Sequence, residues 1–218
     1  MDEIIINETD APEETRAKKI RAVAEALISG RVLILPASTI YGISCRYDDR
    51  KALSRIYGIK RRKTNMPFIV LISDTFQLEM LAKDINITAK KLIKRYWETG
   101  DPRPLTLILK KSNDPAGHIA GTVPTIAVRM AGLKVLRDII DQSGPIVSTS
   151  ATISGASINP DTIGAIPSDI CKKVDMVVRL KGVLRGKEST IVDITGEVPV
   201  LIREGAVSFE SILRELQL

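Results

Sequence analysis

Hydroxyl and arginine side chains gather beside the apolar runs of this sequence, and these segments are the best suited to chemistry. Thr39 follows the apolar run VLIL, and hydroxyl side chains recur over 148–154, after the run PIV. Arg129 stands inside the apolar run TIAVRM, where an arginine is rare without an anionic partner. Hydroxyl groups can bind phosphate oxygens, and a guanidinium offers a planar fork to phosphate or carboxylate. Because open α/β sheets bind ligands where their strands end, these segments predict an anion-binding site there.

Two further polar segments allow either a ligand-binding or a structural interpretation. The run KRRKTNMP at 60–67 combines lysine charges with arginine forks, which suits phosphate, RNA or simple exposure to solvent. The segment GKESTIVD places Ser189 at the start of an expected strand, and VPVLIREGA places Arg203 at the end of the next one. These two residues can line a site, or they can belong to a surface hairpin with charged edges.

Several common catalytic centres are excluded by the residues present. The chain contains no GxxxxGK phosphate loop and no GxSxG nucleophile elbow. Its two cysteines, Cys45 and Cys171, form no CxxC pair, and His118 is its one histidine, so we expect no metal site and no disulfide framework. We interpret Cys45 as a small buried residue rather than a nucleophile. An enzyme of this kind would position reactants and stabilise charge, which suits transfer at phosphorus.

Alternating hydrophobic patterns predict the elements that position these groups. Continuous apolar runs predict strands over 3–7, 32–35, 68–72, 105–110, 125–130, 146–149, 176–180, 190–194 and 198–202. Helical spacing predicts helices over 12–29, 49–60, 76–82, 87–99, 133–141 and 208–218, and one or two short helices within 161–171. The segment 37–44 reads as a polar loop. Alternation of strands and helices indicates an α/β fold, and the hairpin near the end favours a mixed sheet.

The overall composition fits a globular chain. It has 218 residues, of which 44% are apolar and 27% charged, and this length favours one domain or at most two small ones. The net charge of +6 suits an anionic partner such as a nucleotide, a phosphate or RNA, or serves solubility alone. No run approaches the roughly 18 apolar residues of a membrane span. The acidic start MDEIIINETD differs from a secretory signal, and we therefore expect a cytoplasmic protein without membrane contact.

In their order along the chain, these segments resemble the YrdC-like threonylcarbamoyl-AMP synthases, from about residue 16 to about residue 207. The similar segments are PASTIYGI, KRRKTNMPF, GDPRPLT, TIAVR, STSATISG, ESTIVD and LIREGA. The resemblance implies a single domain over 1–218, a twisted mixed sheet with flanking helices and a large concave ligand-binding surface. It also implies that the additional C-terminal domain of longer members is absent.

The family makes threonylcarbamoyl-AMP from L-threonine, bicarbonate and ATP and releases pyrophosphate, so the resemblance implies a nucleotidyltransferase. Its product serves the threonylcarbamoyladenosine modification of tRNA, and tRNA-modification proteins that accept the adenylate are the implied partners. Carried over by position, threonine would be bound by Thr39, Arg129, Ser148 and Ser189. ATP would be bound by Lys60, Arg62, Met66, Thr125, Ser150 and Arg203, and the catalytic residues would be Lys60, Arg62 and Arg203. Magnesium would be held largely by the phosphates.

The chain also departs from the family pattern at positions that could touch a ligand. These positions are Ala37, Ser38, Lys63, Met66, Leu71 and Thr152, the last standing where the family has an asparagine. They keep two other functions open. One is a catalytically altered paralogue that acts as an RNA- or ribosome-binding module, supported by the KRRK run and opposed by an aromatic content of only 4%. The other is a carbamoyl-transferring relative that uses carbamoyl phosphate.

Overall fold

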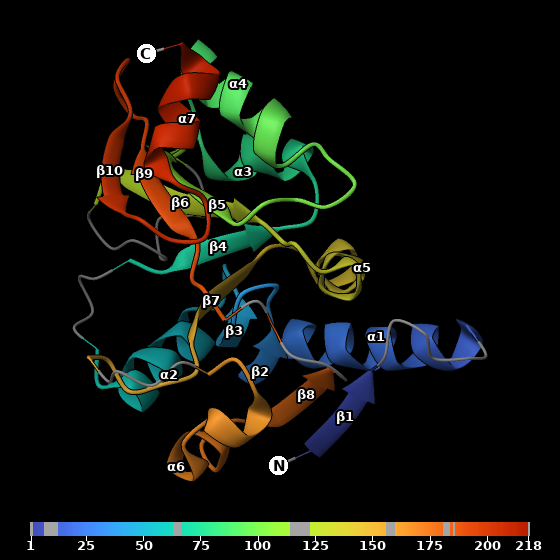
Figure 1. Cartoon of the computed structure of the whole chain (residues 1–218). Helices are drawn as coiled ribbons and strands as arrows, with labels where there is room; N and C mark the ends of the chain where they lie inside the picture. Colours follow the sequence, from blue (N-terminus) through green and yellow to red (C-terminus); the bar gives the residue numbers. More distant parts are fainter. Residues whose placement is uncertain are drawn as a thin grey trace.

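The computed structural model describes residues 2–6, 13–62, 67–113, 123–155, 160–180, 184 and 186–217. Within them, ten strands form one sheet in the order β1-β8-β2-β3-β7-β4-β6-β5-β9-β10 (Figure 1). The strands are β1 (Asp2–Ile6), β2 (Leu33–Pro36), β3 (Tyr41–Arg46), β4 (Ile69–Ile72), β5 (Leu105–Lys110), β6 (Thr125–Met130), β7 (Ile146–Ser150), β8 (Met176–Leu180), β9 (Thr190–Asp193) and β10 (Val200–Arg203).

Parallel and antiparallel pairs are combined in this sheet. β1, β8 and β2 run parallel, as do β4 with β6 and β5 with β9. The other neighbouring strands are antiparallel, including the closing pair β9 and β10. The mixed α/β sheet with flanking helices that the sequence predicts is therefore confirmed.

Helices cover both faces of the sheet. On one face, the apolar sides of α1 (Glu13–Ile28) and α5 (Lys134–Ser143) pack on β1, β2 and β8 and reach β4 and β7. The other face is covered by α2 (Arg50–Lys60), α4 (Ile87–Tyr96), α6 (Ser168–Cys171) and α7 (Phe209–Leu216). Three further short helical segments are η1 (Thr75–Gln77), α3 (Leu78–Leu81) and η3 (Ile163–Ala165). The described apolar cluster beneath α1 and α5 ends at β4 and β7 and includes no residue of β6, β5 or β9, so these two helices leave that part of the face uncovered (Figure 1).

Side-chain caps fix where several helices begin. Asp49, Asn86 and Ser208 each accept a hydrogen bond from the backbone amide three residues later, which satisfies an otherwise unpaired donor. Gly30, with a φ of +79°, follows the end of α1 in a conformation that favours glycine. Ser208 thus caps the start of the helix predicted over 208–218, and Gly30 follows the end of the helix predicted over 12–29.

The loop predicted over 37–44 is wrong for its second half. Tyr41–Arg46 forms β3, which pairs with β2 on one side and with β7 on the other. Gly42 and Ser44 interrupt the apolar pattern and lower the strand propensity of this segment. Pairing on both edges overrides that local preference and places polar residues in the centre of the sheet.

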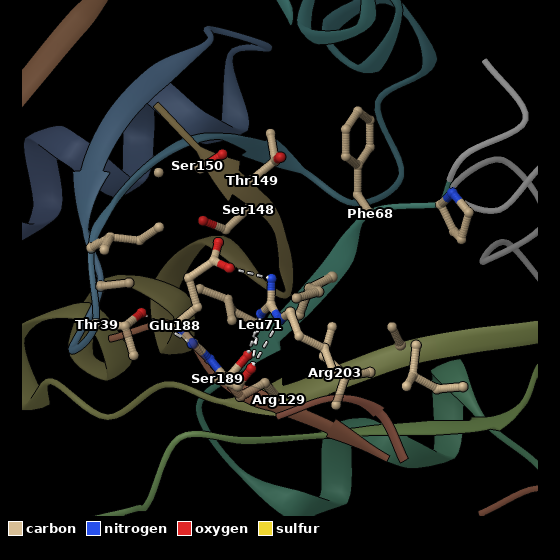
Figure 2. A pocket seen from close by; sticks show the side chains of 18 of the residues that line it. Thr39, Phe68, Leu71, Arg129, Ser148, Thr149, Ser150, Glu188, Ser189 and Arg203 are labelled. Atoms are coloured by element: carbon tan, nitrogen blue, oxygen red, sulfur yellow. Dashed lines mark hydrogen bonds and ion pairs between the residues drawn. The ribbon is translucent and has the colours of Figure 1, made fainter. Parts of the chain in front are cut away.

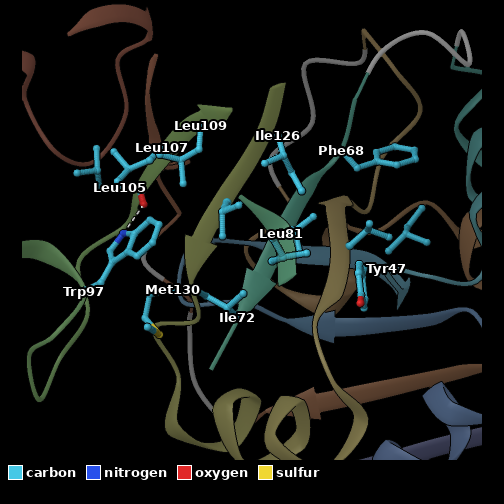
Figure 3. Close-up of a cluster of buried hydrophobic side chains, with 14 of the residues drawn as sticks. Tyr47, Phe68, Ile72, Leu81, Trp97, Leu105, Leu107, Leu109, Ile126 and Met130 are labelled. Atoms are coloured by element: carbon cyan, nitrogen blue, oxygen red, sulfur yellow. Dashed lines mark hydrogen bonds between the residues drawn. The ribbon is translucent and has the colours of Figure 1, made fainter. Parts of the chain in front are cut away.

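The larger core lies on the face covered by α2, α4, α6 and α7 and extends across the sheet from β8 to β9 (Figure 3). Trp97 is fully buried in it, and its indole Nε1 donates a hydrogen bond of 2.9 Å to the carbonyl oxygen of Leu105. This bond ties the end of α4 to the start of β5. None of the described helices combines the length and the apolar character needed to cross a membrane.

Candidate active site

A cleft of about 420 Å³ opens on the part of the sheet face that α1 and α5 leave uncovered (Figure 2). Its floor consists of alternate residues from three neighbouring strands: Ile69, Leu71, Ala127, Arg129, Ser148 and Ser150. Its walls come from the turn after β2, the start of β9 and the end of β10: Thr39, Glu188, Ser189, Ile202 and Arg203. The cleft therefore extends across a sheet face, whereas the sequence pattern placed the site only beyond the strand ends.

Arg129 is the buried cation of this cleft. Its side chain is enclosed, with 5% of the residue surface exposed, and Nη1 donates to Thr39 Oγ1 at 3.3 Å. Its Nε has no hydrogen-bond partner, and no described carboxylate forms an ion pair with it. Burial lowers the pKa of the Arg129 guanidinium to about 10, the positive charge of Arg203 adds to this effect, and the charge of Glu188 opposes it. An anion in the cleft would supply the partner that this buried charge lacks.

Hydroxyl groups stand on the side of the cleft formed by β3 and β7. Thr39 is buried beside Arg129, and Ser148 lies on the cleft floor, paired with Ser44 of β3. A Cβ atom at Gly42 would overlap the hydroxyl of Ser148, so the glycine leaves room for that group. The predicted threonine-binding residues Thr39, Arg129, Ser148 and Ser189 thus all line the same cleft.

Glu188, Ser189 and Arg203 form the opposite wall of the cleft, which we call the corner. Neighbouring groups hold the Arg203 side chain in it. Its Nε and Nη2 donate to the carbonyl oxygen of Ser189 at 3.2 and 2.9 Å, and Nη1 forms an ion pair of 2.6 Å with Glu188 Oε2. The hydroxyl of Ser189, in turn, shares a hydrogen bond of 2.8 Å with Thr106 Oγ1. These contacts aim one arginine and one serine hydroxyl at the cleft.

Thr190 anchors the chain behind this corner. Its buried Oγ1 accepts hydrogen bonds from the amides of Gly205 and Val207, at 2.9 and 3.1 Å, and donates to the carbonyl oxygen of Val207. Gly205 approaches so closely that a Cβ atom there would lie 2.6 Å from the carbonyl oxygen of Ser189. The position of Arg203 relative to Ser189 is therefore set by main-chain packing.

Lys60 lies beneath the cleft and is not one of the residues that line it. Its Nζ donates to the carbonyl oxygens of Ser150 and Thr152, at 2.6 and 2.8 Å, and to the Ser150 hydroxyl at 3.1 Å. Burial lowers the pKa of its ammonium group to about 8. Its three contacts hold the end of β7 in place, so a direct bond between Lys60 and a nucleotide stays a prediction.

The basic run beginning at Lys60 does not form a continuous charged surface. Arg61 is exposed, whereas Arg62 is half-buried, stacks 5.2 Å from the centroid of the Phe68 ring and donates to the carbonyl oxygen of Pro67. Arg62 lines the cleft, its Nε has no hydrogen-bond partner, and burial lowers its pKa. Lys63 lies outside the described residues. This arrangement supports a ligand-binding role for Arg62 over the interpretation as a solvated RNA-binding run.

Thr125, a predicted nucleotide-binding residue, is not among the described residues that line the cleft. Thr125 lies at the first position of β6, on the same strand face as Ala127 and Arg129, and borders a second cavity beside Lys110 and Lys111. Met66 lies outside the described residues. The nucleotide-binding role of these two residues stays a prediction.

Comparison with known proteins places the chain in a family. The Sua5/YciO/YrdC family model, described as "Telomere recombination", matches residues 25–205. The chain belongs to the Sua5/YciO/YrdC family. It is 36% identical over 210 residues to the threonylcarbamoyl-AMP synthase of Pyrococcus abyssi, an alignment that covers 96% of this chain and 59% of the relative. The chain thus spans less than two thirds of that protein.

Other members of the Sua5/YciO/YrdC family match over more of their length or show the same structure. A putative threonylcarbamoyl-AMP synthase of Methanocaldococcus jannaschii is 32% identical over 96% of this chain and 97% of the relative. The crystal structure of Pyrococcus abyssi Sua5 in complex with L-threonine aligns with a TM-score of 0.89 and 33% identity, covering 99% of this chain and 61% of that one. The resemblance to the YrdC-like synthases and the expected fold class are confirmed.

The positions that depart from the Sua5/YciO/YrdC pattern have identifiable surroundings. Ala37 and Leu71 contribute apolar surface to the cleft. Thr152 is buried behind it, where its hydroxyl lies 3.1 Å from that of Ser150 and its carbonyl oxygen accepts from Lys60. Thr152 therefore completes the hydrogen-bond network beneath the cleft without lining it.

Of the charged residues described in the cleft, one was not among the predicted site residues. Glu188, in the segment ESTIVD, lines the cleft, and its position directly before Ser189 was the available signal. The interpretation of Cys45 as a small buried residue is confirmed, since the residue is fully enclosed and burial raises the pKa of its thiol.

Proposed function

We propose that this chain is a threonylcarbamoyl-AMP synthase, which forms the adenylate from L-threonine, bicarbonate and ATP with release of pyrophosphate. The observation that carries the proposal is the buried Arg129, whose guanidinium faces a cleft lined with hydroxyl groups and pairs with no described carboxylate. An arginine of this kind suits a substrate carboxylate, because its planar fork can bind both oxygens. The names of the relatives from Pyrococcus and Methanocaldococcus support the same reaction.

In this proposal the amino acid binds between the β2 turn and the start of β9. Arg129 binds the carboxylate of threonine, while the hydroxyls of Thr39, Ser148 and Ser189 surround the remainder of the molecule. The α-ammonium group first loses a proton. The amino nitrogen then attacks the carbon of bicarbonate, so that an N–C bond forms, a C–O bond of bicarbonate breaks and water leaves. The cleft positions the resulting carbamate for the next step, which lowers the entropic part of the barrier.

The nucleotide occupies the neighbouring part of the cleft. Arg62, Ser150 and Arg203 line it and are proposed to bind the phosphates, and Lys60 contributes through Ser150, which it holds in place. A carbamate oxygen attacks the α-phosphorus, the bond to the β-phosphate bridging oxygen breaks, and pyrophosphate leaves. The two arginines neutralise the charge that develops on the phosphate oxygens.

Magnesium is expected to be held by the phosphates of ATP and to supply further charge neutralisation. Of the described residues that line the cleft, Glu188 alone carries a carboxylate, and that group is paired with Arg203. The described residues contain no cluster of three or more potential metal ligands. A substrate-bound ion fits this set better than a site built from protein side chains.

We further propose that the 218 residues act as one YrdC-like unit and pass the adenylate to proteins that modify tRNA. The test of the reaction is the release of pyrophosphate from ATP in the presence of magnesium and bicarbonate, with and without L-threonine. Serine and alanine serve as control amino acids. We expect threonine-dependent release together with an adenylate of the corresponding mass. ATP binding without any threonine-dependent release would contradict the proposed reaction.

A further inference from the structure

The cleft contains one acidic residue among several cations. Of the described residues that line it, Arg62, Arg129 and Arg203 are positively charged and Glu188 is negatively charged. Figure 2 shows the carboxylate of Glu188 turned into the cleft, toward the guanidinium of Arg203. A carboxylate at this place repels phosphate and bicarbonate, so its presence in an anion-binding cleft needs a separate explanation.

The need to orient Arg203 does not explain why a carboxylate is present at position 188. Two nitrogens of Arg203 already bind the carbonyl oxygen of Ser189, at 3.2 and 2.9 Å, and so hold the guanidinium without the carboxylate. Glu188 uses one oxygen, Oε2, in its ion pair, and Oε1 has no partner among the described residues. One carboxylate oxygen is therefore available to a ligand.

The main chain of Glu188 is fixed, so the carboxylate is held near the cleft. Its carbonyl oxygen accepts a hydrogen bond of 2.9 Å from the amide of Ala206, and Gly205 packs against the same peptide. The side chain itself is 46% exposed, which leaves it accessible to a substrate. A fixed backbone and an accessible carboxylate are the combination expected of a ligand-binding side chain.

Glu188 and Arg129 together form a pair of opposite charges in one cleft. Both side chains line the cleft, and the negative charge of Glu188 raises the pKa of Arg129 against the effect of burial. An α-amino acid carries the complementary pair, a carboxylate and an ammonium group separated by one carbon atom. Among the proposed substrates, only this ammonium group is cationic.

We propose that Glu188 binds the α-ammonium group of the amino-acid substrate while Arg129 binds its carboxylate. This inference rests on the proposed function and adds a determinant of specificity to it. With both charged ends of the substrate bound, the cleft selects α-amino acids over α-hydroxy acids. The carboxylate of Glu188 can also accept a proton from this ammonium group before the nitrogen reacts.

The experiment measures binding by calorimetry for the wild-type chain and for Glu188→Gln. The ligands are L-threonine and its α-hydroxy analogue, which has a hydroxyl in place of the ammonium group. Bicarbonate is left out, and a non-cleavable α,β-methylene analogue of ATP is present, so that no reaction takes place. Glutamine keeps the shape of the side chain and removes its charge. Glu25→Gln, on the exposed side of α1, is the matched control.

We expect Glu188→Gln to weaken threonine binding about tenfold or more and to leave the hydroxy analogue within about twofold. The control should bind both ligands as the wild type does. Equal losses for both ligands, or a loss confined to the ATP analogue, would overturn the assignment, because Glu188 would then act only through Arg203. Threonine binding that survives the change would also overturn it and leave the proposed function intact. A wild-type chain that binds no threonine would instead overturn the proposed function, and this inference with it.

Discussion

Lys60 and Ser150 are joined at two atoms of the serine: the ammonium nitrogen lies 2.6 Å from its carbonyl oxygen and 3.1 Å from its hydroxyl. The same nitrogen reaches the carbonyl oxygen of Thr152 at 2.8 Å. One buried side chain at the end of α2 thus satisfies acceptors at the end of β7, where the cleft floor is formed. Loss of this side chain should therefore lower the stability of the folded chain.

Replacement of Lys60 by methionine should destabilise the folded chain by about 1 to 3 kcal/mol, because it removes the donor to the buried carbonyl oxygen of Thr152 and one of the two donors to that of Ser150. Burial lowers the pKa of Lys60 to about 8, from 10.5 in the unfolded chain. Between these values the unfolded chain binds more protons than the folded one, so the contribution of Lys60 to stability rises with pH. Urea unfolding of both proteins from pH about 7 to about 10 should show a growing stability difference. A difference that shrinks above pH 8 would contradict this assignment.

The strands and helices could largely be predicted from the sequence, because buried runs and capping residues act locally. The strand β3 could not, since Gly42 and Ser44 break its pattern and only pairing with β2 and β7 decides its conformation. The site likewise contains residues that could be predicted from the sequence and one whose placement could not. Residue types in ordered segments indicated Arg129 and Ser189, but the burial of Lys60 beneath the cleft depends on how α2 meets β7, which no local pattern encodes.

Replacement of Arg129 by methionine should stabilise the free chain and abolish threonine binding. The wild-type residue is a buried cation without an ion-pair partner among the described residues, and its desolvation costs free energy until a carboxylate arrives. We expect a gain of about 1 to 4 kcal/mol for Arg129→Met and the loss of any threonine-induced rise in Tm. Thermal unfolding with and without threonine measures both effects. The matched control is Arg95→Met, at a surface ion pair with Glu215. A destabilised Arg129→Met chain that still responds to threonine would exclude this role.

Replacement of Gly205 by alanine should impair the corner of the cleft at Ser189. The added Cβ atom would lie 2.6 Å from the carbonyl oxygen of Ser189, so the two segments must move apart. We expect a loss of about 1 to 3 kcal/mol in stability and weaker binding of both threonine and ATP, because Ser189 and Arg203 move together. Denaturant unfolding and calorimetry measure these effects. Gly196→Ala, where nothing lies within 4 Å of the new atom, should behave as the wild type. Unchanged binding in a folded Gly205→Ala chain would show that the corner is not part of the site.

Removal of one charge from each of two neighbouring arginines distinguishes the enzyme from an RNA-binding module. Arg62 lines the cleft and stacks on Phe68, whereas Arg61 points to solvent. Arg62→Met should weaken ATP binding about tenfold and leave threonine binding unchanged, while Arg61→Met should affect neither. An RNA-binding surface would respond differently, because each arginine would then contact an RNA phosphate. The two substitutions would weaken RNA binding, and reduce its salt dependence, to a similar extent. Calorimetry with ATP, together with RNA titrations at two salt concentrations, separates the cases. Equal effects of both changes on RNA and none on ATP would favour the RNA-binding module, since only the enzyme requires that the half-buried arginine differ from its exposed neighbour.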